Sequence, residues 1–300
     1  MNKRKSLRNM MWAYIFILPS FVLLVIFHLI PIWMTFRYSL SSYNVIQAPI
    51  YIGAENYRKL WKDPFVISSL WNTGIYTLIV VPMQTILSML IAYLLSRKFN
   101  NKLGNFVRSA MFIPVITSMI LTSAVWRLLL SGNAEGVVNS VIGFFGIAPV
   151  NWLGKSWPAL IAVCIIAVWK NTGYFLVIFY AGMMDIPVSL YEAATVDGAG
   201  GISQFFYITL PSLKPVVYLV VTLGTIWSFQ VFDLVYTLTG GGPGRATTTL
   251  VLSIYNSAFK DYKMGYASAI SVILLFIVLA VSLLQKAAFR GDQEKRRRGV

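Results

Sequence analysis

A polar interruption between two long apolar segments has the most informative spacing in this chain. It reads Tyr191-Glu192-Ala193-Ala194-Thr195-Val196-Asp197-Gly198 and closes on Ile208-Thr209-Leu210-Pro211. Ser189 and Glu192 have the spacing of a capping box, in which each side chain bonds a backbone amide near the other. Gly198 falls where a left-handed residue ends a short helix. The pattern predicts a docking element, a rigid helix–turn–helix whose two alanines let a partner surface approach closely.

The carboxylate of Glu192 has two compatible interpretations, a helix cap and an ion pair with a partner protein. A second short helix is predicted through Phe205 and Phe206, and it ends by Pro211. Apolar anchorage of this helix is expected from four consecutive side chains: Phe205, Phe206, Tyr207 and Ile208.

Other polar groups lie inside apolar segments, where a central charge costs roughly 2.5–3.5 kcal/mol on insertion scales. Lys170 and Asp233 have opposite signs and are candidates for a pair. Aromatic rings beside the polar groups suit stacking against sugar rings, but the membrane interface also collects Trp and Tyr, so packing in such a belt is the alternative. The candidate substrate-path residues, with Gln230 preferred, are Asn171, Tyr174, Trp227, Gln230 and Asp233.

Two glycine-containing motifs imitate nucleotide-binding loops. Gly240-Gly241-Gly242-Pro243-Gly244 lacks the Lys-Ser/Thr that completes a P-loop, and it favours a flexible outer loop. Gly154-Lys155-Ser156 has Pro149 where the first glycine is required, so ATP binding by this chain is rejected. A single histidine, His28, excludes a His-based metal cluster, and a single cysteine, Cys164, excludes an internal disulfide framework.

The composition indicates a bilayer as solvent. Of 300 residues, 57% are hydrophobic and 12% charged, against about 25% charged in soluble domains. The net charge of +15 favours positive charge held on one side of a membrane over nucleic-acid binding. Spanning a bilayer takes about 20 mostly apolar residues per helix. The six segments that qualify are 11–34, 70–95, 106–130, 157–183, 213–236 and 266–288.

The sequence therefore predicts an all-α polytopic membrane protein with six transmembrane helices. The first segment follows basic residues but is too long for a signal peptide and lacks a clear cleavage site, so it is interpreted as an uncleaved anchor. With the N-terminus inside, 15 Lys and Arg fall on inner segments and eight on outer ones. The inner residues include Arg97, Lys98, Lys102, Arg108, Lys214 and, in the tail, Arg298. Both termini and the Glu192 loop are expected in the cytoplasm.

The segment 191–211 resembles, at every defined position, the EAA loop of membrane subunits in binding-protein-dependent ABC importers. Other stretches are similar to the carbohydrate branch of that family, with Met183-Met184 departing from its Leu-Gln. These stretches are Phe16–Pro19, Ala181–Pro187, Phe232–Pro243, Tyr255 with Phe259, and Gly265–Ala269. The resemblance covers nearly the whole chain and implies the six-span form of a type I ABC importer permease.

That resemblance implies a permease domain over 11–288 with a coupling loop at 185–212, between basic cytoplasmic segments 1–10 and 289–300. It implies no catalysis and no cofactor on this chain, because ATP and Mg bind partner ATPase subunits. The partners implied are a second homologous permease, two ABC ATPase subunits, an extracytoplasmic solute-binding protein and a sugar, in a bacterial or archaeal cell (inner) membrane and without nucleic acid. The residues implied to contact the ATPase are Tyr191, Glu192, Ala193, Ala194, Asp197 and Gly198, and those implied to meet the binding protein are Gly240, Gly241, Gly242 and Pro243.

Three alternatives stay open. The first alternative is an importer of this class that carries glycerol-3-phosphate, a peptide or an amino acid. An ion-coupled secondary transporter would use Lys170 and Asp233 as a relay. A membrane-embedded transferase is disfavoured, because the ten acidic residues are scattered singly.

Overall fold

The computed structural model describes residues 3–97, 101–133 and 136–297. Two of the predicted inner charges, Lys98 and Arg298, lie outside the described residues, as do the ends of the predicted terminal segments. The chain divides into two compact units, one of Met1–Lys62 with Ile254–Ile273 and one of Asp63–Ser253 with Leu274–Val300. The described part is mostly helical, with only two two-residue strands, which confirms the predicted all-α class.

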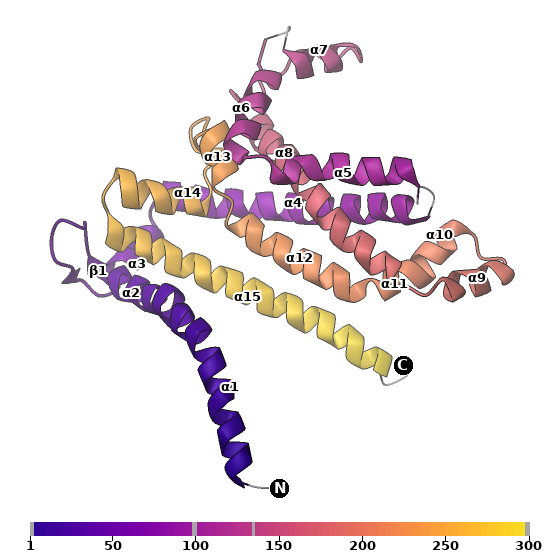
Figure 1. The fold of residues 1–300 in the computed structure, drawn as a ribbon. Coiled ribbons are helices and arrows are strands. Elements are labelled where there is room, and N and C mark those ends of the chain that lie inside the picture. Colours follow the sequence, from indigo (N-terminus) through magenta and orange to yellow (C-terminus); the bar gives the residue numbers. More distant parts are fainter. Residues whose placement is uncertain (1–2, 98–100, 134–135, 298–300) are drawn as a thin grey trace. The chain divides into compact units, whose positions relative to one another are not determined.

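The first unit begins with one continuous run of helix. It comprises α1 (Lys3–Leu24), a π-helical turn η1 (Val25–Leu29) and α2 (Ile30–Ser39) (Figure 1). Its apolar window within Tyr14–Ser39 is 0% buried. Apolar side chains without a core to enter must face lipid or another chain, so this helix has the surface of a peripheral span.

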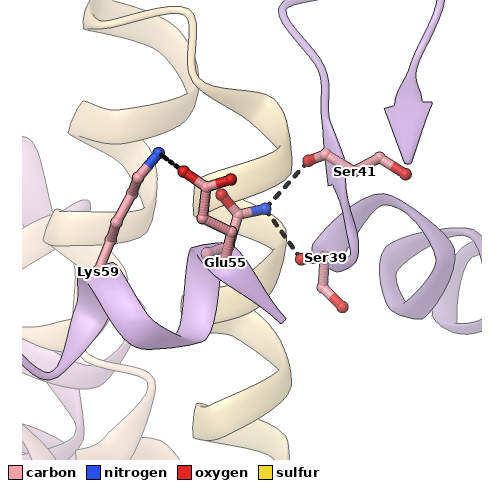
Figure 2. A network of polar contacts seen from close by, with 5 residues as sticks. Ser39, Ser41, Glu55 and Lys59 are labelled. Carbon is pink, nitrogen blue, oxygen red and sulfur yellow. Dashed lines mark hydrogen bonds and ion pairs between the residues drawn. The ribbon is translucent and has the colours of Figure 1, made fainter. Parts of the chain in front are cut away.

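A small polar network closes the rest of the first unit. The strands β1 (Ser41–Ser42) and β2 (Ile50–Tyr51) pair antiparallel, and α3 (Glu55–Leu60) follows. The buried amide of Asn56 donates from Nδ2 to the backbone oxygens of Ser39 at 2.9 Å and Ser41 at 3.0 Å (Figure 2). On the exposed face, Lys59 Nζ lies 2.6 Å from Glu55 Oε1, and this bonded cation lowers the pKa of the Glu55 carboxyl. The network fixes α3 against the end of α2. The unit is completed by η3 (Asn256–Lys260) and the first part of α15 (Met264–Arg297).

The second unit is a bundle built around α8. This helix (Ser156–Met184) packs along α4 (Pro64–Arg97) and α5 (Lys102–Ile116), and α12 (Lys214–Phe229) packs on α4 and α8 (Figure 1). The remaining elements of the unit are α6 (Met119–Leu129), α7 (Val137–Gly143), α9 (Val188–Val196), α10 (Gly201–Gln204), η2 (Phe205–Thr209), α11 (Leu210–Ser212), α13 (Asp233–Leu238), the first part of α14 (Leu250–Tyr255) and the part of α15 that begins at Leu274.

Small residues on the helix faces allow the close packing of this bundle. A Cβ on Gly173 of α8 would lie 1.9 Å from the carbonyl oxygen of Met111 on α5, so only glycine permits that crossing. A Cβ on Gly224 of α12 would lie 2.3 Å from Nε2 of Gln84 on α4. Small residues at such crossings bring backbones together where lipid offers no hydrophobic driving force.

The predicted spans correspond to four single helices and two bent pairs. Within the described residues, four helices are long and apolar enough to cross a membrane, and there are up to six spans if each bent pair counts as one. The predicted spans at 106–130 and 213–236 are each interrupted and are not formed by one helix. The first bends by 101° between α5 and α6. The second ends as a helix at Phe229 and resumes as α13 at Asp233, and its bent partner is Gly201–Ser212, at 68°.

The break between α5 and α6 has a local cause and a distant one. Pro114 lacks an amide hydrogen, and Thr117 adopts an extended backbone, so the helix cannot continue. The carbonyls left open are satisfied from α8, because Lys170 Nζ donates to the oxygens of both Pro114 and Thr117 at 2.7 Å.

Candidate functional site

The predicted coupling loop forms a helix–turn–helix at one end of the bundle, between α8 and α12 (Figure 1). The helix α9 ends in a Schellman motif. Ala199 N donates to Ala194 O at 2.8 Å, and Gly198 N donates to Thr195 O at 3.0 Å. Gly198 has a φ of +79°, so the predicted left-handed conformation is confirmed.

The predicted capping box is wrong. The N-cap of α9 is Pro187, and no side chain caps this end. The helix begins two residues earlier than predicted, at Val188 instead of Leu190, so Ser189 lies inside the first turn and Glu192 is too far along to reach back. The proline explains the shift, because its fixed φ of −56° sets the turn into the helix one position ahead of the serine. Glu192 is exposed and has no ion-pair partner among the described residues.

The second arm runs one residue beyond its predicted end at Pro211. It passes through the π turn η2 and finishes at Ser212, whose Oγ donates to Ile208 O at 2.7 Å. The predicted apolar anchorage is half right. Phe205 is 8% exposed and Ile208 packs on the core, but Phe206 is 56% and Tyr207 81% exposed. Consecutive residues of a helix point about 100° apart and cannot share one face.

The coupling residues divide between two faces of the loop. Glu192, Ala193, Asp197 and Gly198 are exposed, and Ala194 is half-buried. Tyr191 is buried at 5% exposure, and its hydroxyl lies 2.9 Å from Thr209 Oγ1, so its ring faces the bundle. The first group is available to a partner surface, while Tyr191 belongs to the attachment of the loop.

Residues outside the predicted motif hold the loop to α4. The guanidinium of Arg97 lies 3.8 Å from the centre of the Tyr191 ring, and its Nη2 donates to Gln204 Oε1 at 3.1 Å. Tyr93 Oη donates to Gly201 O at 2.9 Å. The sequence marked Arg97 only as an inner positive charge. Gln204 could have been recognised in the sequence as a structural contact, because it is a polar residue amid apolar ones.

Three of the five candidate substrate-path residues lie near one another. The rings of Tyr174 and Trp227 are 4.9 Å apart, centre to centre. Asn171, less than one helical turn before Tyr174 on α8, donates from Nδ2 to Gln84 Oε1 at 2.9 Å. Sequence reasoning missed Gln84, although a buried glutamine within an apolar span is itself a signal of a polar pathway or a helix contact.

The other two candidates, Gln230 and Asp233, are exposed where the chain breaks between α12 and α13. Gln230 N donates to the backbone oxygen of Trp227 at 3.2 Å, but no described side-chain hydrogen bond joins Gln230 or Asp233 to Asn171 or Trp227. The predicted pair of Lys170 and Asp233 is wrong. The ammonium of Lys170 caps the open end of α5, as described above, and Asp233 stands in the first turn of α13, where the helix dipole favours a carboxylate.

The loop of glycines, predicted to be a flexible outer loop, bonds to α4 and to the residues that follow it. Asn72 of α4 donates from Nδ2 to the backbone oxygens of Arg245 at 2.8 Å and Thr248 at 3.1 Å. Thr248 Oγ1 donates to Gly241 O at 3.1 Å. A Cβ on Gly241 would lie 2.8 Å from that same hydroxyl oxygen, so the turn is fitted to glycine. Of the predicted contacts for a binding protein, Gly240 is exposed, Gly241 is buried, and Gly242 and Pro243 are half-buried.

Fold and loop together define the membrane-spanning permease of a type I ABC importer. A solved structure with the same fold is the bacterial ABC transporter involved in the import of the acidic polysaccharide alginate. One of its chains matches with a TM-score of 0.82 and 20% identity, over 95% of this chain and 97% of that one.

Curated relatives extend the similarity to the whole sequence. The trehalose/maltose transport system permease protein MalF of Thermococcus litoralis is 34% identical over 93% of this chain and 95% of its own length. The arabinooligosaccharides transport system permease protein AraP of Bacillus subtilis is 32% identical over 93% and 90%. The family model of the binding-protein-dependent transport system inner membrane component matches residues 64–291. The chain belongs to that family.

Proposed function

We propose that this chain is a permease subunit of an ATP-driven importer and passes a sugar or oligosaccharide across the membrane. A solute-binding protein outside the membrane delivers the substrate. The observation that carries the proposal is the rigid loop between α8 and α12. Its first helix, α9, is ended by left-handed Gly198, and the loop presents Glu192 and Asp197 at the tip of a transmembrane bundle. The names of the curated relatives support a carbohydrate as substrate.

The contribution of this chain is a conformational change. Two ATPase subunits bind ATP and Mg and grip the coupling loop from the cytoplasm. Their closure moves the loop, and the helices attached to it tilt as rigid bodies. A second, homologous permease supplies the other half of the path. No bond of the substrate is made or broken, and this chain holds no cofactor.

The substrate passes the polar and aromatic groups of the second unit. Tyr174 and Trp227 offer adjacent ring faces, which suit stacking against a sugar ring. Asn171 and Gln230 offer amides for its hydroxyls, and Asp233 accepts hydrogen bonds. In the structure the amide of Asn171 is engaged with Gln84, so substrate binding at Asn171 requires that bond to open.

The proposed topology places both termini and the coupling loop in the cytoplasm. The permease domain extends over 11–288, with basic cytoplasmic segments before and after it. The turn from Gly240 to Pro243 lies outside and meets the binding protein. Its attachment to α4 through Asn72 and the neighbouring backbone supports a preformed contact surface there.

Uptake by the reconstituted importer tests the proposal. The chain is assembled with its partner permease, ATPase and binding protein in proteoliposomes, and the entry of labelled mono- and oligosaccharides is followed with and without ATP. We expect uptake of at least one carbohydrate that requires both ATP and the binding protein. Glu192→Lys, which reverses the exposed charge of the loop, should abolish uptake and leave membrane insertion intact.

Two outcomes would refute the proposal in different ways. Uptake of an amino acid, a peptide or glycerol-3-phosphate in place of every sugar would leave the importer but overturn its substrate. Uptake driven by an ion gradient in the absence of ATP would overturn the importer itself and favour an ion-coupled transporter.

A further inference from the structure

We infer that Arg97 is the positioning residue that makes the coupling loop move together with α4. The inference rests on the proposed function. Arg97 is the last residue of α4, and its guanidinium contacts both arms of the loop. It lies 3.8 Å from the centre of the Tyr191 ring in α9 and donates to Gln204 Oε1 in α10 at 3.1 Å. One cation from a third helix therefore joins the two arms.

Gln204 extends this contact across the turn. Its side chain is 7% exposed, and while Oε1 accepts from Arg97, Nε2 donates to Thr195 Oγ1 at 2.9 Å and Ala199 O at 3.1 Å. Those two acceptors flank Gly198, the residue that reverses the chain. Both polar atoms of the amide are thus engaged, and the turn cannot shift relative to α10 without breaking one of these bonds.

A second contact from the same face of α4 strengthens the attachment. Tyr93 lies four residues before Arg97, so both side chains project from one side of the helix. Its hydroxyl donates to Gly201 O at 2.9 Å, at the start of the second arm. The last turn of α4 therefore bonds the backbone of the loop at Gly201 and contacts the side chains of the loop at Tyr191 and Gln204.

The same helix reaches the outer loop at its other end. Asn72, near the start of α4, donates to the backbone of Arg245 and Thr248. At 1.5 Å per residue, about 38 Å of helix separates Asn72 from Arg97. When the coupling loop moves and α4 moves with it, the motion therefore reaches the segment around Arg245 and Thr248, which is proposed to meet the binding protein.

The chemistry of the site calls for arginine in particular. A guanidinium is planar, so it can stack on an aromatic ring with its face while its edge donates hydrogen bonds. A lysine ammonium is a point charge that satisfies one of these partners at a time. The Arg97→Lys variant should therefore recover part of what Arg97→Ala loses.

The test measures how tightly ATP hydrolysis is coupled to uptake. In the full reconstituted complex with binding protein, Arg97→Ala should lower the sugar imported per ATP hydrolysed at least fivefold, and Arg97→Lys should be intermediate. Arg108→Ala is the matched control. Its guanidinium lies 4.0 Å from the Tyr180 ring, so the variant removes an equal charge and an equal kind of contact from α5 without touching the loop, and its ratio should stay at the wild-type value.

Hydrogen exchange in the same complexes provides a readout that needs no substrate. Amides of residues 191–204 should exchange faster in Arg97→Ala than in wild type, and Arg97→Lys should restore part of the protection. If Arg97→Ala does not assemble, Gln204→Leu removes the acceptor instead and should give both effects. A wild-type ratio in Arg97→Ala, or an equal loss in Arg108→Ala, overturns the role of Arg97. If the hydrogen-exchange pattern is as expected but the wild type shows no ATP-driven sugar uptake, the result would instead refute the proposed function.

Discussion

Replacement of Gly198 tests whether the backbone shape of the coupling loop is essential. Gly198 has a φ of +79°, and a Cβ built there would meet no atom within 4 Å. A substitution therefore adds no collision and acts only through the backbone. The left-handed conformation costs roughly 1–2 kcal/mol for most L-residues and less for Asn, and this corresponds to about a 5- to 30-fold shift in the population of the native turn.

The expected order of activity is Gly, then Asn, then Ala, then Val. Asn should transport near the wild-type level, Ala should lose about fivefold, and Val, whose branched side chain is least compatible with a positive φ, should lose nearly all uptake. The assay is ATP-dependent uptake of labelled sugar by proteoliposomes that contain the full complex. Binding-protein-stimulated ATPase activity is measured in parallel, because a misfolded loop should disconnect hydrolysis from uptake.

A glycine two residues away supplies the control. Gly200 has a φ of −71° and also has no atom within 4 Å of a built Cβ, so Gly200→Ala should transport normally. Two results would refute the reasoning. One is a Val variant with wild-type uptake, which would show that the turn is not needed. The other is an Asn variant as poor as Val, which would show that side-chain size, and not φ, governs the position.

Three further substitutions test the packing and the polar contacts, each by thermal unfolding in detergent or by proteolysis. Gly173→Ala should destabilise the bundle by about 1–3 kcal/mol, because its Cβ would collide with Met111 O. The control Gly74→Ala should be neutral, because a Cβ there has no atom within 4 Å. Equal stability of the two variants would contradict the close crossing of α8 and α5. Lys170→Met should cost about 1–3 kcal/mol, because Thr117 O loses its donor and Pro114 O keeps only the Thr117 hydroxyl. Lys170→Arg should be less affected, and no difference from wild type would remove the proposed cap. Asn139→Leu deletes five hydrogen bonds within the loop that follows α6 and should make residues 131–155 sensitive to protease; unchanged resistance would mean that the bonds do not order that loop.

The sequence predicted the helical class and the main spans because a bilayer imposes a simple rule. A chain that crosses lipid must satisfy its backbone internally, so long apolar stretches become helices. The left-handed conformation of Gly198 was equally predictable from the sequence, because glycine after a short helix is a local signal that needs no distant partner. For the same reason the sequence located the coupling loop between its two spans.

The errors have a common physical origin in contacts between distant residues. The bend after Pro114 is stable because Lys170, 56 positions later, caps the open carbonyls, and no local pattern reveals that contact. The same contact explains why Lys170 does not pair with Asp233. The glycine turn is attached to α4 through Asn72, which lies 173 positions before its acceptor Arg245.

The amino-acid sequence alone determined that this protein is a helical membrane protein with a short helix–turn–helix between two of its spans. Those properties follow from hydropathy, charge and short-range backbone preference, all of which act within a few residues. The tertiary structure alone decided which side of the loop each residue occupies. It placed Tyr191 beneath the loop and against Arg97, and left Glu192 exposed. The side that each loop residue faces depends on where α4 ends relative to α9. The packing of the bundle sets that position, and no single segment of the sequence encodes it.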